Sequence, residues 1–442
     1  MTRFVRSEFF PPVAILTIEN PPVNALGDGV WEAIDEAVAA AAREDSVAAI
    51  ILMGGGTTFV AGADINVFRQ LRTEADALAR LEKFHALLCR LEDTPKPLIA
   101  AIHGHALGGG LELAMACHYR IATMDAKVGQ PEVLLGIIPG AGGTQRLPRL
   151  VGPELALKMC TDGKSIAAPH AAAAGLIDHI IAGDIRSSAL GYARAKAVQR
   201  TVRKTREVTL APEQLDSGLR AAATLKTDLL KSARGLRAPV AAVESIEAGL
   251  QLPFDQGSAR ERELFAACVV SVESRSLRHL FFAERDAARL PADLGRASAS
   301  EIRTAAVIGG GTMGTGIAMA YANSGVRVLL KEVDDAALAR AMATITKTWD
   351  SAVAKGRFDA YERDRRLSLI TPTTTYDDFM QADIVVEAVF EDLALKQQTF
   401  AALGRVTRDD CVLATNTSTL DVDAIAAASG RPAQVVGHHF FS

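Results

Sequence analysis

The stretch from Thr304 to Glu332 constrains the fold of this 442-residue chain more than any other segment. A short apolar run, Thr304–Ile308, leads into the pattern G-x-G-x-x-G at Gly309–Gly314, and a run of helix-forming residues follows. A second apolar run then ends at Glu332, about 20 residues beyond the first glycine. Strand, glycine turn, helix, strand and acid in this order predict a β-α-β unit of a doubly wound parallel sheet.

A glycine turn that opens a helix presents backbone N–H groups and the positive end of the helix dipole to a phosphate. We therefore expect a dinucleotide here, in contact with Gly309, Gly311, Thr312, Met313 and Gly314. A carboxylate at Glu332 would bind the hydroxyls of an adenosine ribose and repel the additional phosphate of NADP. The expected cofactor is therefore NAD.

A second glycine-rich stretch, Ala106–Arg146, carries two glutamates. Gly108–Gly110 precede Glu112 in the first turn of an expected helix, and Glu132 follows 20 residues later. Two carboxylates in different environments can divide the roles of proton donor and acceptor. Backbone N–H groups can stabilise an oxyanion by roughly 3–4 kcal/mol each. On these residues alone, a plain turn and a glutamate that only favours the helix dipole are the alternatives.

Length and composition limit the class of protein. A chain of 442 residues exceeds one ordinary core, so two or three domains are expected. The net charge of −4 gives no reason to expect nucleic acid as a partner. No apolar run reaches membrane length and no secretory signal is recognised, so integral membrane contact is not expected. The 5 cysteines form no spaced pair, which fits a reducing compartment.

The first part of the chain alternates strand and helix patterns, which predicts a layered α/β region. The expected elements are strands at Val13–Ile18, Val47–Leu52, Leu98–Ile102 and Tyr119–Ala122 and a helix at Val30–Arg43. From Leu190 to Arg289 helix formers dominate, with an amphipathic helix at Arg275–Ala287 and a connector at Arg289–Ala299. The predicted domains are an α/β core at 1–190, a helical part at 191–278, a linker helix and connector at 279–302, and a nucleotide-binding domain at 303–442.

Residues 10 to about 185 resemble the crotonase, or enoyl-CoA hydratase, family. The matching segments are PPVNAL (21–26), FVAGADI (59–65), HALGGGLEL (105–113) and GQPEVLLGIIPGAGGTQRLPR (129–149). The resemblance implies a crotonase (ββα spiral) fold in which Glu112 and Glu132 position a water and pass protons. It also implies oxyanion-binding N–H groups at Ala63 and Gly109. The loops expected against the adenosine end of coenzyme A contain Ala25, Ala61, Asp64 and Ile65.

Residues 303–442 resemble the NAD-binding, Rossmann-type domain of 3-hydroxyacyl-CoA dehydrogenases. The matching segments are IGGGTMGTGIA, ADIVVEAVFEDLALK (382–396), ATNTSTL (414–420) and GHHFF (437–441). The resemblance implies that Glu391 and Lys396 lie near the nicotinamide ribose and substrate. It makes Ser418 the residue that holds the substrate hydroxyl and His439 the general base. In isolation, a strand histidine and a hydroxyl that caps a turn are the alternatives.

In that dehydrogenase family, an orienting glutamate and a helical domain follow the base histidine, whereas this sequence ends at Ser442. From this departure we expect NAD to bind but the oxidation step to be weak or absent. A truncated end would also leave apolar surface exposed.

A hydratase fused upstream of such a dehydrogenase resembles the multifunctional enzymes of fatty acid β-oxidation. The resemblance implies hydration of 2-trans-enoyl-CoA to 3-hydroxyacyl-CoA and NAD-dependent oxidation to 3-ketoacyl-CoA. An enoyl-CoA isomerase, an acyl-CoA hydrolase and a non-catalytic scaffold for acyl-CoA and NAD are the alternatives. A monomer is expected, with oligomers left open. The alanine-rich composition suggests a bacterial cytoplasm, and a peroxisome is the alternative.

Two histidines, His103 and His105, alternate on an expected strand and can face the same way. Because no third ligand is placed nearby, we interpret them as ordinary strand positions and expect no metal site.

Overall fold

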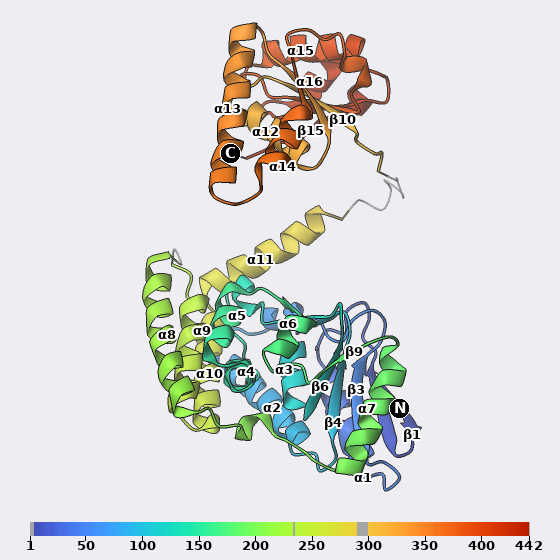
Figure 1. The fold of residues 1–442 in the computed structure, drawn as a ribbon, viewed down its shortest axis with the longest axis vertical. Helices are drawn as coiled ribbons and strands as arrows, with labels where there is room; N and C mark the ends of the chain where they lie inside the picture. Colours follow the sequence, from blue (N-terminus) through green and yellow to red (C-terminus); the bar gives the residue numbers. More distant parts are fainter. Residues whose placement is uncertain (1–3, 233–234, 290–298, 442) are drawn as a thin grey trace. The chain divides into compact units, whose positions relative to one another are not determined.

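The computed structural model describes residues 4–232, 235–289 and 299–441 (Figure 1). Two compact units, Met1–Leu290 and Pro291–Ser442, make up the chain, and each is described by itself. Apart from its two end residues, the connector predicted at Arg289–Ala299 lies outside the described residues. No helix among the described residues has both the length and the apolar character needed to cross a membrane.

The first unit is built on a six-stranded sheet with the order β1-β2-β3-β4-β6-β9. Its strands are β1 (Val5–Phe10), β2 (Val13–Ile18), β3 (Ala49–Gly54), β4 (Leu98–Ile102), β6 (Tyr119–Thr123) and β9 (His179–Ile181). All neighbours run parallel except the β1–β2 pair. Every residue of β2, β3 and β4 is buried, which explains why these strands are unbroken apolar runs in the sequence. The three strands predicted at positions 13–18, 98–102 and 119–122 are confirmed, and the fourth lies two residues later than predicted.

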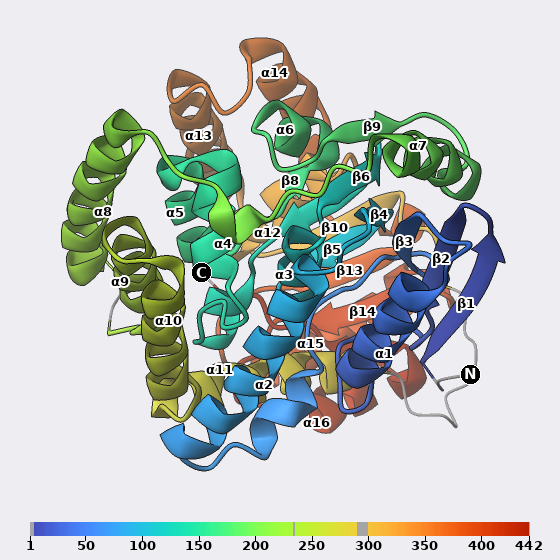
Figure 2. The ribbon, with the colours of Figure 1, turned by 90° about the horizontal axis from the view of Figure 1, so that it is seen from below.

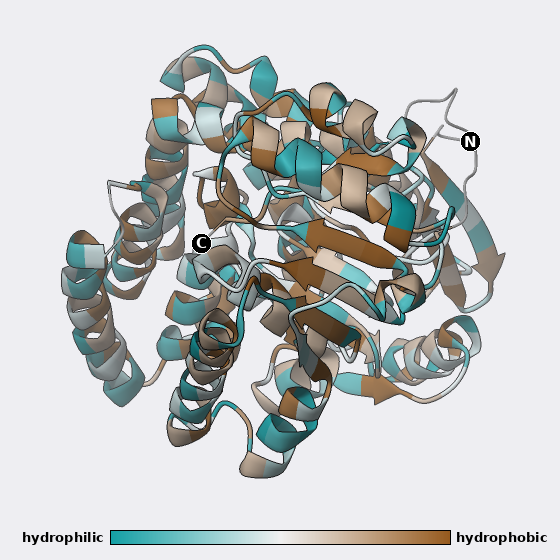
Figure 3. Cartoon of the chain, turned by 90° about the horizontal axis from the view of Figure 1, so that it is seen from above, coloured by the Kyte–Doolittle hydropathy of each residue, from teal (hydrophilic) through white to brown (hydrophobic). Residues whose placement is uncertain are grey.

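Helices cover both faces of this sheet. One face packs against α7 (Ile185–Gln199), which presents Ala189, Ala193 and Ala197 at intervals of one turn. The other face packs against α1 (Val30–Arg43), as predicted, and the larger core of the unit. In Figure 3, which looks from above onto the second unit, the strands of that unit's sheet are likewise mostly apolar.

A small second sheet with the order β5-β7-β8 stands next to the main one. It consists of β5 (His105–Leu107), β7 (Lys127–Gly129) and β8 (Ile166–Ala167). The interpretation of His103 and His105 as positions on one strand is wrong. The chain turns at Gly104, with φ of +59°, where an added Cβ would lie 2.2 Å from the Thr57 carbonyl oxygen. Within the described residues, no group of three or more metal-ligating side chains occurs.

The remaining helices of the first unit include α3 (Gly109–Ala116), which contacts α2, α4, β5 and β6 near the centre of the unit (Figure 2). Their bounds are α2 (Glu74–Glu92), α4 (Gly143–Val151), α5 (Pro153–Asp162), α6 (Ala168–Ala173), α8 (Pro212–Ser232), α9 (Ala238–Gln251), α10 (Phe254–Val269) and α11 (Val272–Ala287). Helix α9 packs against α4 and α5, and helix α10 packs against α2 and α4. The predicted helical stretch therefore shares one core with the sheet part.

The second unit contains a parallel six-stranded sheet with the order β12-β11-β10-β13-β14-β15. Its strands are β10 (Thr304–Ile308), β11 (Arg327–Lys331), β12 (Ile370–Thr373), β13 (Ile384–Glu387), β14 (Val412–Thr415) and β15 (Val435–Gly437). Its helices are α12 (Thr312–Asn323), α13 (Asp335–Ala354), α14 (Ala360–Ser368), α15 (Leu393–Val406) and α16 (Val422–Ala428). The strand order reverses beside β10, where open α/β sheets form a crevice for ligands.

A buried ion pair joins α2 to α4. Arg146 Nη2 lies 2.9 Å from Glu92 Oε2, and both side chains are almost completely enclosed. We predict that Glu92→Leu lowers the free energy of unfolding of the first unit by about 3–5 kcal/mol, because it leaves the Arg146 charge buried without its carboxylate. Denaturation followed by Trp31 fluorescence in a Trp349→Phe background measures this change.

The matched control is Glu263→Leu, which breaks the exposed Arg260–Glu263 pair and should cost no more than about 1 kcal/mol. Equal effects of the two substitutions would contradict the prediction.

Candidate active site

The first candidate site is centred on the start of α3. Gly108, with φ of 52° and ψ of −126°, precedes this helix, and Glu112 lies in its first turn. A Cβ added to Gly108 would lie 2.8 Å from Glu132 Oε1. Glycine at this position therefore lets the Glu132 carboxyl approach the backbone in front of α3, and the two glutamates meet although they are 20 residues apart.

Glu112 is a buried carboxyl held by backbone. Its Oε1 accepts hydrogen bonds from the N–H groups of Ala141 and Gly143, each at 2.8 Å. Burial, partly offset by these hydrogen bonds and by the charge of Arg146, raises the pKa of Glu112 to about 7. A carboxyl of this pKa can accept a proton at neutral pH and release it again.

Glu132 begins the short 3₁₀ turn η2 (Glu132–Leu135) and is partly exposed. With its amide nitrogen turned toward Glu132, Gln130 donates to the two carboxyl oxygens at 3.0 and 3.2 Å. Desolvation and the neighbouring charge of Glu112 raise the pKa of Glu132 well above its usual value. The environment of Glu132 therefore favours the protonated form, and the two backbone donors favour the ionised form of Glu112.

Two backbone amides lie close together beside these carboxyls. A Cβ added to Gly109 would lie 3.7 Å from the Ala63 nitrogen. Leu26 pairs with the residues on either side of Ala63, accepting from Asp64 N–H and donating to Gly62 O, so the Ala63 N–H points away from this pairing. Among the described residues, neither the Ala63 nor the Gly109 N–H donates to a protein acceptor. The pair is available for an oxyanion.

The four residues expected against coenzyme A lie on two adjoining loops. The Ala61 N–H donates to Val23 O at 3.1 Å, and Asn20 Nδ2 holds the Ala25 carbonyl at 2.7 Å. Asp64 caps the 3₁₀ turn η1 (Ile65–Arg69) by accepting from the Asn66 N–H. The structure brings these loops together next to Ala63, and their contact with coenzyme A stays a prediction.

Helices α10 and α11 also contribute to the site, and this contribution is not predicted by the sequence. Glu261 of α10, 1% exposed, accepts from the N–H groups of Gly142 and Thr144 at 2.6 and 2.9 Å. On α11, Ser274 Oγ donates to Leu135 O at the end of the Glu132 turn. The signal for Glu261 was its position on the apolar face of its helix, three and four residues before Leu264 and Phe265.

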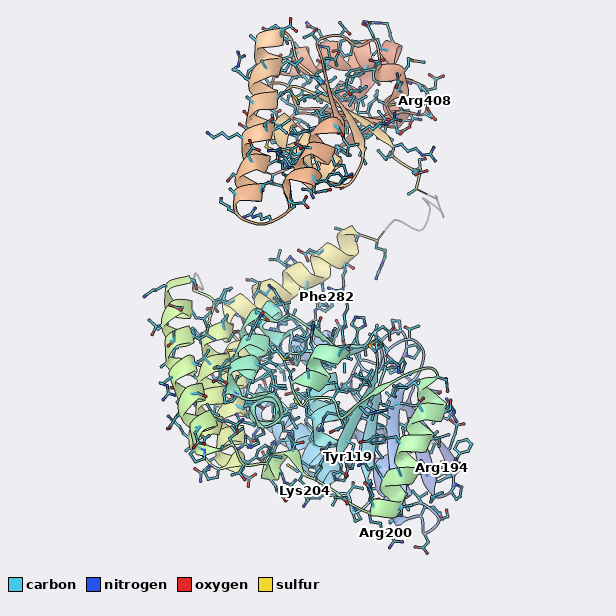
Figure 4. The ribbon with its side chains drawn as sticks, viewed as in Figure 1. Tyr119, Arg194, Arg200, Lys204, Phe282 and Arg408 are labelled. Atoms are coloured by element: carbon cyan, nitrogen blue, oxygen red, sulfur yellow. The ribbon has the colours of Figure 1, made fainter. Side chains whose placement is uncertain are left out.

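Helix α11 also reaches the loop next to Ile65. Arg278 Nη1 donates to Phe68 O at 2.8 Å, and the guanidinium of Arg69 lies 4.4 Å from the ring centroid of Phe282. Figure 4 labels Phe282 on α11. The predicted linker helix therefore packs against the 3₁₀ turn that begins at Ile65.

The second candidate site is the glycine turn after β10. Gly309 has φ of +94°, and a Cβ added to Gly314 would lie 1.6 Å from Gly309 O, so only glycine allows this turn. Gly311 and Thr312 are exposed at the start of α12. Glu332 Oε1 accepts the Gly310 N–H at 2.5 Å, which fixes the carboxylate beside the turn. Exposed N–H groups and a fixed carboxylate fit a dinucleotide and its ribose.

Glu391 is the centre of a polar cluster at the ends of β13 and β14. Its Oε1 accepts from Thr417 Oγ1 at 2.6 Å and from the N–H and Oγ of Ser418 at 2.8 and 3.1 Å. Burial opposes ionisation, but these hydrogen bonds outweigh it and lower the pKa of Glu391 to about 2. Lys396, 1% exposed, pairs with Glu387 at 2.7 Å and lies 3.4 Å from Glu391. The buried ammonium group of Lys396 therefore links the carboxylates of Glu387 and Glu391.

A cavity of about 330 Å³ opens over this cluster. Met313, Glu391, Ser418 and His439 all line it. The structure thus brings together the predicted hydroxyl, the predicted base and one residue of the glycine turn. Their contacts with substrate and cofactor stay predictions.

An α/β unit with two carboxyls of raised pKa beside paired free amides, followed in the chain by a dinucleotide-binding unit, defines a class of acyl-CoA enzyme. The chain belongs to the enoyl-CoA hydratase/isomerase family, whose sequence profile matches residues 9–250. Residues 304–442 match the NAD binding domain of 3-hydroxyacyl-CoA dehydrogenase. The predicted fold class and the two resemblances are confirmed, and the domain boundaries stay predictions.

Similar proteins combine the same two parts. A peroxisomal fatty acid beta-oxidation multifunctional protein of Arabidopsis thaliana is 39% identical over 97% of this chain and 60% of its own length. The peroxisomal bifunctional enzymes of Danio rerio and Homo sapiens are 40% and 36% identical over 97% of this chain and 58% and 59% of their own lengths. The chain thus spans about 60% of the length of these relatives.

The glycine turn makes a sharp prediction for NAD affinity. Gly314→Ala places a methyl group against Gly309 O and must displace the turn, so the Kd for NAD should rise at least about tenfold. Gly316→Ala on the same helix meets nothing within 4 Å and should leave the Kd unchanged. Calorimetric titration with NAD measures both, and equal affinity of the two variants would contradict the assignment.

Proposed function

We propose that this chain hydrates 2-trans-enoyl-CoA thioesters to 3-hydroxyacyl-CoA at the site formed by Glu112 and Glu132. The observation that carries the proposal is a pair of carboxyls with raised pKa values, the buried Glu112 and the partly exposed Glu132, beside the free N–H groups of Ala63 and Gly109. Attack of water at C3 moves negative charge onto the thioester oxygen, which the two amides would bind. Glu112 would take the proton from water, and Glu132 would give its proton to C2.

For the second unit, we propose that Ser418 binds the 3-hydroxyl and that His439 removes its proton. When bound, NAD supplies the hydride acceptor. Because the Ser418 hydroxyl donates its hydrogen bond to Glu391, the lone pairs of Ser418 Oγ remain available to accept a hydrogen bond from a substrate hydroxyl. Hydration followed by oxidation to 3-ketoacyl-CoA is the combined activity that the two units support, and fatty acid β-oxidation is its proposed role.

The names of the relatives favour the peroxisomal alternative for this chain. A bacterial cytoplasm, expected from alanine content alone, stays a prediction. Microscopy of the tagged chain in its source cell separates the two.

An isomerase that moves a double bond with one acid is the second candidate for the first site. The partly exposed Glu132, with its raised pKa, is the observation that favours it, since one carboxyl can shuttle a proton between two carbons. A non-catalytic scaffold would bind crotonyl-CoA without consuming it. Loss of absorbance from the conjugated thioester therefore separates an enzyme from a scaffold.

The two glutamates can be tested separately. Glu112→Gln and Glu132→Gln should each lower the kcat of hydration at least about 100-fold, because each removes one proton-transfer group. The substrate KM should change little. Glu263→Gln, on the surface of α10, is the matched control and should retain full activity. Survival of hydration in Glu132→Gln, or its loss in only one variant, would favour a mechanism with one acid.

The pH dependence follows from the raised pKa values. The carboxyl of Glu112 must be ionised to accept a proton, so kcat/KM should rise with pH through about 7. Glu132 must be protonated, so the rate should fall again at higher pH, as its raised pKa is passed. Initial rates between about pH 5 and pH 10 measure both limbs. A rate that is already maximal at pH 5 would contradict these assignments.

A further inference from the structure

We propose that Glu261 is a positioning residue for Glu112: it holds the turn at residues 141–144 so that two of its N–H groups point at the Glu112 carboxyl. This inference rests on the proposed hydratase function. It concerns a side chain that reaches neither the predicted coenzyme A loops nor the paired amides.

The four N–H groups of this turn are divided between two carboxyls in strict alternation. Ala141 and Gly143 donate to Glu112 Oε1, and Gly142 and Thr144 donate to Glu261. These are the N–H groups before and at the start of α4, which have no partner inside the helix. Because alternate N–H groups go to different carboxyls, the turn separates Glu261 from Glu112.

The backbone of the turn at residues 141–144 is not restrained by its own side chains, because two of its four residues are glycines. Gly142 has φ of 92°, and a Cβ added to Gly143 would lie 2.7 Å from Glu112 Oε1, so the sequence must use glycines that leave the backbone unrestrained. Side chains from other elements supply the restraint instead. Arg146 Nη1 donates to Ala141 O at 3.3 Å at one end, and Glu261 binds Gly142 and Thr144 at the other.

Glu261 is itself anchored to two helices. Thr144 Oγ1 donates a hydrogen bond to its Oε2 and lies 2.6 Å from Ser245 Oγ on α9. Gln145 Nε2 adds a hydrogen bond to Ser245 O at 3.0 Å. A buried carboxyl is costly, and desolvation with the charge of Glu112 raises the pKa of Glu261 to about 8. The hydrogen bonds from Gly142, Thr144 N–H and Thr144 Oγ1 offset part of this cost by satisfying both carboxyl oxygens.

Glu261→Gln is the main test. Its amide oxygen can still accept one N–H, but its NH₂ group faces the second donor, so the turn should loosen. We expect kcat to fall about 10- to 100-fold with KM changed less than about twofold. Glu263→Gln, two residues away and exposed, should behave as wild type.

A double-mutant cycle separates positioning from a general loss of stability. If Glu261 acts through Glu112, adding Glu261→Gln to Glu112→Gln should lower kcat no further. Additive losses, or a change mainly in KM, would overturn the inference. Should Glu261→Gln fail to fold, Thr144→Val keeps the backbone donor but removes the hydroxyl link, and its cycle with Glu112→Gln decides the question.

Amide hydrogen exchange gives a readout that needs no activity. Exchange in the peptide covering residues 138–147 should be faster in Glu261→Gln and unchanged in Glu263→Gln. Unchanged exchange in Glu261→Gln would overturn the inference even if hydration is observed. A wild-type chain that consumes no enoyl-CoA would instead refute the proposed function, and exchange would still decide whether Glu261 holds the turn.

Discussion

The first unit depends on one constraint: a carboxyl buried at the start of α3 needs hydrogen-bond donors, and the nearest ones are backbone amides of a turn 30 residues away. Those amides are free because they stand before the first turn of α4. Glycine is required at 143 because a Cβ would lie 2.7 Å from Glu112 Oε1, and at 142 because its φ is +92°. Burial of Glu112 thus fixes the sequence of the turn, the start of α4 and the packing of α10 behind it.

Much of this arrangement could be predicted from the sequence. Strands such as Leu98–Ile102 are unbroken apolar runs, because they are buried on both faces, and glycine turns beside acids mark the two sites. β1 was not predicted, because its exposed positions interrupt the apolar pattern. His103 and His105 were placed on one strand, because the sequence does not reveal that Gly104 must pass close to Thr57.

The helical region shows where local patterns fail. Residues beyond 190 predict helices, but the sequence does not show which loops those helices contact, because these contacts join positions more than 100 residues apart. Glu261 carried a usable signal, an acid on an apolar helix face, and Ser274 carried none. The sequence predicts a helical part at 191–278 but does not reveal that its helices bind the turns beside Glu112 and Glu132.

The two carboxyls of that site are held by different helices. The turn at residues 141–144, which donates to Glu112, is bound to α10 through Glu261. The turn that begins at Glu132 is bound to α11 through Ser274. Helices α10 and α11 follow each other directly, with Ser271 as the N-cap of α11, so a substitution that shifts either helix also shifts the turn beside one of the two carboxyls.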